Sequence, residues 1–134
     1  MTKALSVARA KDREVMAALI EETVKAHGGI AVRAAAGLCT LREIRIEIQS
    51  ANGLSCGIDL DGDSHMDRDG MFCLPWFLRG NARMSDEFGR VAGAEVNSYH
   101  RQKCTAFANG FDDLLAKIAA VLDCVASGEA FEKF

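Results

Sequence analysis

The chain has little of several features that would assign it to a specialised class of protein. Its 134 residues include one proline, one tryptophan and one tyrosine. No segment approaches the run of about 20 apolar residues that crosses a bilayer. Residues 1–10 lack the apolar stretch of a secretory signal peptide. We therefore expect a cytoplasmic protein that makes no membrane contact.

The cysteines form no pattern typical of a disulfide framework or a zinc site. Their number is odd and no C-x-x-C pair occurs. They are Cys39, Cys56, Cys73, Cys104 and Cys124. Each has apolar or small neighbours, and free cysteines in such surroundings are commonly buried. The sequence therefore predicts inert thiols in the core.

The charge balance argues against a duplex-binding protein, and the absence of known motifs argues against an enzyme of a familiar motif-bearing class. The chain carries 16 basic and 19 acidic residues, for a net charge of −3, so the strongly positive stripe of a duplex-binding domain is missing and direct DNA binding is not expected. It also has no G-x-S-x-G, Walker, G-x-G-x-x-G or H-E-x-x-H motif. A small enzyme whose His, Cys and Asp side chains meet only in the fold remains an alternative.

Two segments have the periodicity of amphipathic helices. Residues 12–27 carry an apolar stripe that Gly28 and Gly29 end, and residues 113–126 carry another that Gly128 ends. The first stripe consists of Val15, Met16, Leu19, Ile20 and Val24, and the second includes Leu114, Ile118, Val121, Leu122 and Val125. We predict that both stripes face the core.

Three segments are predicted to form strands. Residues 41–49 alternate between apolar and charged side chains, and Asn52-Gly53 favours a tight hairpin turn into a second strand over residues 54–60. Residues 71–78 form a third apolar run, and residues 96–108 can supply one or two more strands. Residues 30–38 allow a short turn or an extended connector. Residues 81–93 allow a loop or one short helix capped by Ser85.

These elements lack the alternation of βαβ units, which favours the α+β class. We expect residues 1–134 to form a single domain. Its antiparallel sheet should have three to five strands, with an N-terminal and a C-terminal helix packed on one face.

The acidic segment 59–70 is the first candidate site. It resembles an EF-hand calcium loop, because carboxylates occupy the first, third, fifth and ninth positions. These are Asp59, Asp61, Asp63 and Asp67. However, Ser64 replaces the usual glycine and Gly70 the bidentate glutamate, so we expect at most weak calcium or magnesium binding. The alternatives are a solvated acidic loop and an acidic mimic of nucleic acid that blocks a partner.

Residues 71–78 are the second candidate site, because they are apolar on both faces and contain the only proline. A strand apolar on both faces is typical of a covered sheet, whereas proline is confined to edges, strand ends and bulges. We interpret the segment as an edge or bulged strand covered by another subunit. Pro75, Trp76 and Phe77 would then lie at the contact. The alternative is coverage by the C-terminal helix of the same chain.

The third candidate is the only basic cluster with an aromatic residue. Tyr99, His100, Arg101 and Lys103 are suited to a phosphate or an acidic partner, and the alternative is a solvated strand edge or turn. Together the sequence favours a non-catalytic binding or accessory protein that acts as a homo-oligomer, with the dimer as its simplest form.

Overall fold

A computed structural model describes residues 2–35, 44–50, 52–60, 70–79, 82–93, 104–128 and 131–133. The helices are α1 (Thr2–Ala26), α2 (Asp86–Ala92) and α3 (Phe111–Ala126). The main sheet consists of β1 (Ile30–Ala35), β2 (Ile44–Gln49), β3 (Leu54–Leu60), β4 (Met71–Leu78) and β6 (Cys104–Asn109). Two short strands, β5 (Ala82–Met84) and β7 (Phe131–Lys133), pair separately.

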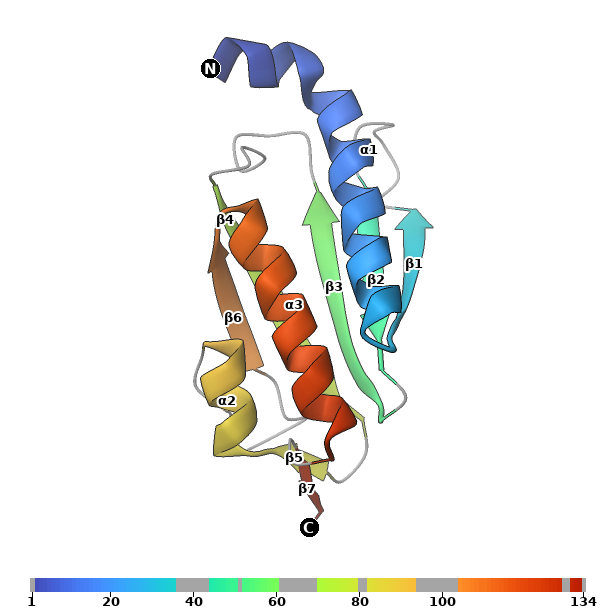
Figure 1. The fold of residues 1–134 in the computed structure, drawn as a ribbon, viewed down its shortest axis with the longest axis vertical. Coiled ribbons are helices and arrows are strands. Elements are labelled where there is room, and N and C mark those ends of the chain that lie inside the picture. The colour runs from blue at the N-terminus through green and yellow to red at the C-terminus, as the bar shows by residue number, and fades with distance from the viewer. Residues whose placement is uncertain are drawn as a thin grey trace.

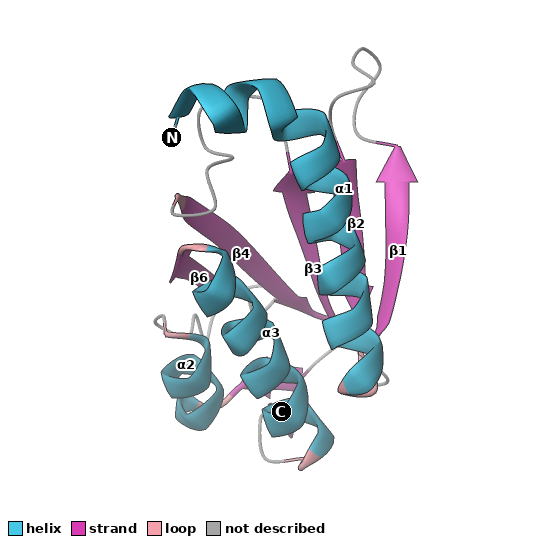
Figure 2. Cartoon of the chain, turned by 45° about the horizontal axis from the view of Figure 1, so that its top comes forward, coloured by secondary structure: helices cyan, strands magenta, loops and turns pink. Residues whose placement is uncertain are grey.

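The five strands follow the order β1-β2-β3-β4-β6, and every neighbouring pair is antiparallel. The long helices α1 and α3 lie on the same face of this sheet (Figures 1 and 2). The predicted α+β class, with terminal helices on one face of an antiparallel sheet, is therefore confirmed. None of the helices in the described ranges is long and apolar enough to cross a membrane.

The N-terminal helix is longer than predicted and is rotated relative to the expected stripe. Met16, Ile20 and Val24 are buried, whereas Val15 and Leu19 are exposed, Leu19 at 37%. Each helical residue turns by about 100°, so positions 15 and 19 lie about a quarter turn to the side of positions 16 and 20. The expectation that Val15 and Leu19 face the core is wrong, because the face of the helix that packs against the core is narrower than the run of apolar residues.

The described parts of the segments that the sequence left open form regular structure. Residues 30–35 form β1, an edge strand, and residues 104–109 form the single strand β6. Ser85 caps α2 as anticipated, because its side chain accepts a hydrogen bond from the Phe88 N–H. The hairpin turn at Asn52-Gly53 is also confirmed, and Gly53 has the positive φ that favours glycine.

The core fills the space between the sheet and the helices. Trp76 is 1% exposed and packs edge-on against Phe88, with ring centroids 6.2 Å apart. Its neighbours in the chain, Pro75 and Phe77, point to the opposite face, as the alternation of a strand requires. The structure therefore places Trp76 in the core and removes it from the expected contact surface.

Strand β4 is not an edge strand. It lies between β3 and β6, and the alternative interpretation, coverage by helices of the same chain, holds for the face that carries Trp76.

The packing predicts that the same substitution, leucine to alanine, lowers the free energy of unfolding by different amounts at two positions. Leu122→Ala should lower the free energy of unfolding by about 2–5 kcal/mol, because Leu122 is 3% exposed in the core. Leu19→Ala should cost less than about 1 kcal/mol, because much of its side chain is already hydrated. Urea unfolding of both variants at one protein concentration measures the difference, and equal costs would show that the phase of α1 is incorrect.

Candidate binding surface

One face of the sheet carries no described helix, and we call it the open face. The register identifies its residues: Ile48 is buried under the helices and pairs with Ala31, so Val32 and its partner Glu47 point the other way. Seven large apolar side chains are exposed in the described ranges, and five of them lie on the open face. These are Ile30 and Val32 of β1, Met71 and Phe77 of β4, and Phe107 of β6.

Most of this apolar surface follows the pair β4 and β6. Met71, Cys73, Pro75 and Phe77 alternate along β4, and Phe107 pairs directly with Cys73. We call these five residues the apolar strip. Met71 is 58% exposed and Phe107 49%. A solvated sheet face normally carries polar side chains, so the strip departs from the pattern of an ordinary outer surface.

Pro75 limits how far β4 pairs with β3. The ladder between β4 and β6 has six residue pairs. The ladder between β3 and β4 has only three, and its last pair is Cys56–Trp76, so it stops at the residue next to Pro75. Proline has no N–H to donate, so a ladder commonly stops there. Beyond this point β3 and β4 diverge (Figures 1 and 2). A proline is thus accommodated in an interior strand because one of its two ladders has already ended.

A band of charged side chains separates the apolar strip from the apolar residues of β1. Arg45 donates from Nε to Glu47 at 2.7 Å and from Nη1 to Asp59 at 2.8 Å. Its guanidinium lies over Gly57, where a Cβ atom would overlap it. These hydrogen bonds raise the pKa of Arg45, so the arginine stays charged. Asp59, a predicted metal ligand, is occupied by this ion pair.

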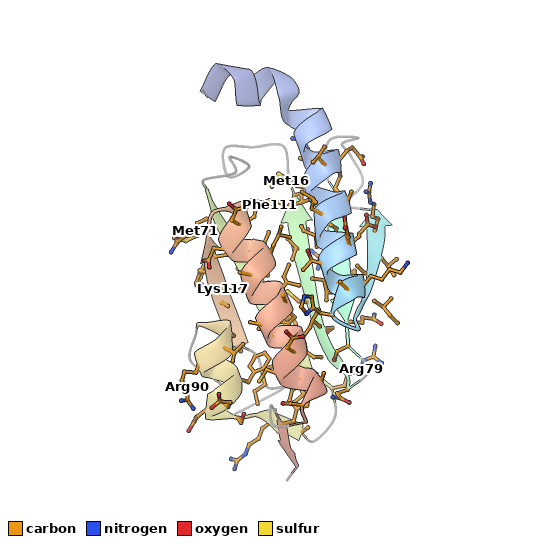
Figure 3. All side chains as sticks on the ribbon, in the orientation of Figure 1. Met16, Met71, Arg79, Arg90, Phe111 and Lys117 are labelled. Carbon is orange, nitrogen blue, oxygen red and sulfur yellow. The ribbon has the colours of Figure 1, made fainter. Side chains whose placement is uncertain are left out.

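The outer edge of β6 is capped by two side chains of α3. The Asn109 N–H donates to the Asp113 carboxylate at 2.9 Å, and Lys117 Nζ donates to the Phe107 carbonyl at 2.6 Å. Figure 3 shows Lys117 on the side of α3 that faces β6. Asp113 and Lys117 also form an ion pair at 3.3 Å. Such capping reduces the capacity of an edge strand to pair with another chain.

Two of the four cysteines in the described ranges are poorly suited to act as nucleophiles. Burial raises the pKa of Cys104 to about 11 and that of Cys56 well above its usual range, which suppresses their thiolates near neutral pH. These two cysteines confirm the prediction of inert core thiols, whereas Cys73 contradicts it, because it is exposed in the apolar strip. His27 pairs with Asp123 at 2.8 Å and joins α1 to α3.

Several predicted site residues lie outside the described ranges, and their roles stay predictions. They are Asp61, Asp63 and Asp67 of the acidic segment, and Tyr99, His100, Arg101 and Lys103 of the basic cluster. Within the described ranges, no group of three or more His, Cys, Asp or Glu side chains is arranged to hold a metal ion. Weak calcium or magnesium binding by residues 59–70 therefore rests on the sequence alone.

Sequence reasoning located only the part of the apolar surface that lies on β4. The signal for β4 was present, because its odd-numbered positions are apolar as well as its even-numbered ones. Phe107 and Val32 carry no comparable signal, since their exposure depends on which face of the sheet the helices cover.

No protein-family model matches the chain, and no curated protein or solved structure is significantly similar to it. Its function therefore has to follow from its own residues.

The cap on β6 predicts a specific pH dependence. The Asn109 N–H and Lys117 lower the pKa of Asp113, so the stabilisation from its carboxylate is present above the unfolded pKa of about 3.9 and is lost as the pH falls through the lower, folded value. Asp113→Asn should therefore destabilise the protein at about pH 7 and lose this effect near pH 2.

Asp112→Asn is the matched control, because Asp112 lies in the same first turn of α3 and interacts with the same helix dipole. Urea unfolding at several pH values compares the two variants. An Asp113→Asn effect equal to that of Asp112→Asn at every pH would show that the bond to Asn109 contributes nothing.

Proposed function

We propose that the protein is a non-catalytic binding or accessory protein that acts as a homo-oligomer and contacts a protein partner through the open face of its sheet. The observation that carries this proposal is the concentration of exposed apolar side chains on that face, opposite the helices. The contact residues are those of the apolar strip. They include Pro75 and Phe77, which the sequence had already suggested.

The composition of the strip supports a binding role more than its size does. From Met71 to Phe77 it follows β4 for about 20 Å, and with β6 it is about 10 Å wide, which gives about 200 Å² in flat projection. This area is below the roughly 300–600 Å² of the largest apolar patch on a typical monomer, so area alone does not set the strip apart. Its composition does, because methionine and aromatic side chains are enriched in protein interfaces.

The surroundings of the strip favour binding over chemistry. The charged group next to it, Arg45 with Glu47 and Asp59, is internally paired. The exposed thiol of Cys73 belongs to the face opposite His27, which lies at the end of α1 in the helical layer. An apolar surface flanked by paired charges suits a protein contact, in which aromatic anchors supply affinity and a polar rim supplies specificity.

Homo-oligomerisation is supported by the second apolar region of the open face. Ile30 and Val32 lie on an edge strand, separated from the strip by the charged band. A protein with two separate apolar regions on one face can bury one of them against its own copy and keep the other for a partner.

The assembly state is directly measurable. We expect the chain to sediment as a dimer or larger at about 100 μM, a concentration at which dimers with micromolar dissociation constants persist. Sedimentation velocity between about 1 and 100 μM should show the mass falling on dilution. A monomer throughout this range would contradict the homo-oligomeric part of the proposal.

The open face can be tested with an apolar dye. Phe107→Ser should reduce the binding of anilinonaphthalene sulfonate by about twofold or more, because it removes the more exposed of the two phenylalanine rings in the strip. Leu19→Ser is the matched control, since Leu19 is also exposed but belongs to the helical layer. Equal dye binding by both variants would mean that the strip is not a distinct apolar surface.

A further inference from the structure

We propose that the homo-oligomer forms through β1, which pairs antiparallel with β1 of a second copy about a two-fold axis at Val32. The two five-stranded sheets would then become one continuous sheet of ten strands. This inference rests on the proposed function only in assuming a homo-oligomer. It adds the surface and the register.

The two edges of the sheet differ in how they are protected. On β6, Asp113 and Lys117 occupy outward backbone groups. On β1, the hydrogen bonds of the neighbouring hairpin show which backbone groups point outward. This hairpin, between β2 and β3, closes with a hydrogen bond from the Ser50 N–H to the Leu54 carbonyl. Because bonded pairs alternate in antiparallel sheets, residues 45, 47 and 49 of β2 bond to residues 34, 32 and 30 of β1.

The N–H and C=O groups of Ala31 and Arg33 therefore point away from the sheet. Within the described ranges, no hydrogen bond to these groups occurs outside the sheet. The side chain of Arg33 does not cover this edge either, because it forms ion pairs with Glu14 and Glu21 of α1 at 2.6 and 2.9 Å. An uncapped edge strand of this kind is a template for pairing with another strand.

The register of self-pairing follows from the same alternation. Only residues with outward groups can form bonded pairs, and a two-fold axis at Val32 places Ala31 opposite Arg33 of the second copy on both sides. An axis at Arg33 would set two arginines opposite each other. An axis at Ala31 would move much of the pairing beyond the first residue of β1. The axis at Val32 uses residues 30–34 fully and opposes no like charges.

Val32 then meets Val32 of the second copy on the open face. Directly opposed side chains in such a non-bonded pair have Cβ atoms about 4.5–5.5 Å apart, and β-branched pairs stabilise antiparallel sheets. The pairing would cover Val32, which is 54% exposed in the single chain. On the helical face, the small side chain of Ala31 leaves room for the longer Arg33 opposite it.

The side of α1 next to β1 carries charges that would complement those of the second copy when the same two-fold axis is applied. Arg33 bonds to both Glu14 and Glu21, so these residues face β1. Ala18 and Lys25 share their stripe, because the spacings of four, seven and eleven residues return to one side of a helix. The two-fold axis makes the α1 helices of the two copies antiparallel. It passes near the middle of the stripe formed by residues 14, 18, 21 and 25, because Arg33 is next to Val32 and bonds to both Glu14 and Glu21.

Glu14 of each copy therefore approaches Lys25 of the other, at the two ends of the contact. Ala18, near the middle, keeps the helices from clashing. The open faces of both copies stay on the same side of the joint sheet, and the two apolar strips lie at its outer ends, uncovered by the self-contact.

A charge exchange at Val32 tests this geometry. Val32→Asp and Val32→Lys should each raise the dimer dissociation constant by about tenfold or more, because like charges would face each other at the axis. An equimolar mixture of the two should form heterodimers that native mass spectrometry resolves by mass. Both variants should fold, since Val32 is a surface position.

Ile30→Asp is the matched control on the same strand and face. Residue 30 lies opposite residue 34 of the second copy, so the new charge meets no like charge, and dimerisation should weaken less than in Val32→Asp. A dimer that persists in Val32→Asp, or a mixture that forms no heterodimer, would overturn the edge contact.

Cys73 separates this inference from the proposed function. Its labelling by a maleimide, followed by peptide mapping, should proceed at the same rate in dimer and monomer, because an edge contact leaves the strip open. If dimerisation slows this labelling while Val32→Asp leaves the dimer intact, the copies meet through the open face. The homo-oligomer would then stand and the edge contact would fall. A wild-type monomer at about 100 μM would overturn both.

Discussion

The fold depends on the packing of two long helices against a single face of the sheet. A strand alternates its side chains between the two faces, so this one-sided coverage divides every strand into a buried and an outward set. In β2 the outward set, Arg45, Glu47 and Gln49, is polar and needs no cover. In β4 the outward set contains Met71, Cys73, Pro75 and Phe77, and no described helix covers it. The candidate binding surface is thus a direct consequence of how the helical layer is placed.

The sequence predicted the elements whose two faces differ in polarity. The alternation of β2 and the Asn52-Gly53 turn each have one physical interpretation, and both are confirmed. Prediction failed where two faces look alike. Residues 71–78 are apolar on both sides, so nothing local shows that Trp76 faces the helices and Phe77 does not. Similarly, adjacent apolar residues in α1 left its rotation undetermined by about a quarter turn, which misplaced Val15 and Leu19.

The candidate surfaces depend on tertiary relations that no single segment contains. Phe107 becomes a binding candidate because β6 pairs with β4 and sets it beside Cys73. Strand β1 becomes an open edge because none of the other described strands pairs with its outer side. Its alanine-rich sequence gives no strong preference for a strand, and the pairing with β2 supplies the conformation. Asp113 and Lys117 acquire their role as caps only when α3 returns beside β6.

The two proposed contacts, one at the edge of the sheet and one on its open face, would depend on different forces. Edge pairing is directional, because backbone N–H and C=O groups must align. Its register depends on which alternate residues have outward backbone groups and on the charged side chains beside the strand. Face contacts are apolar and depend on shape and buried area. Since side chains of α3 occupy outward groups of Phe107 and Asn109 on β6, the proposed edge pairing uses β1, at the far end of the sheet from the apolar strip. The proposed self-assembly through β1 would leave the strip available, and the charged band around Arg45 separates the two apolar regions, which limits the size of either exposed apolar surface.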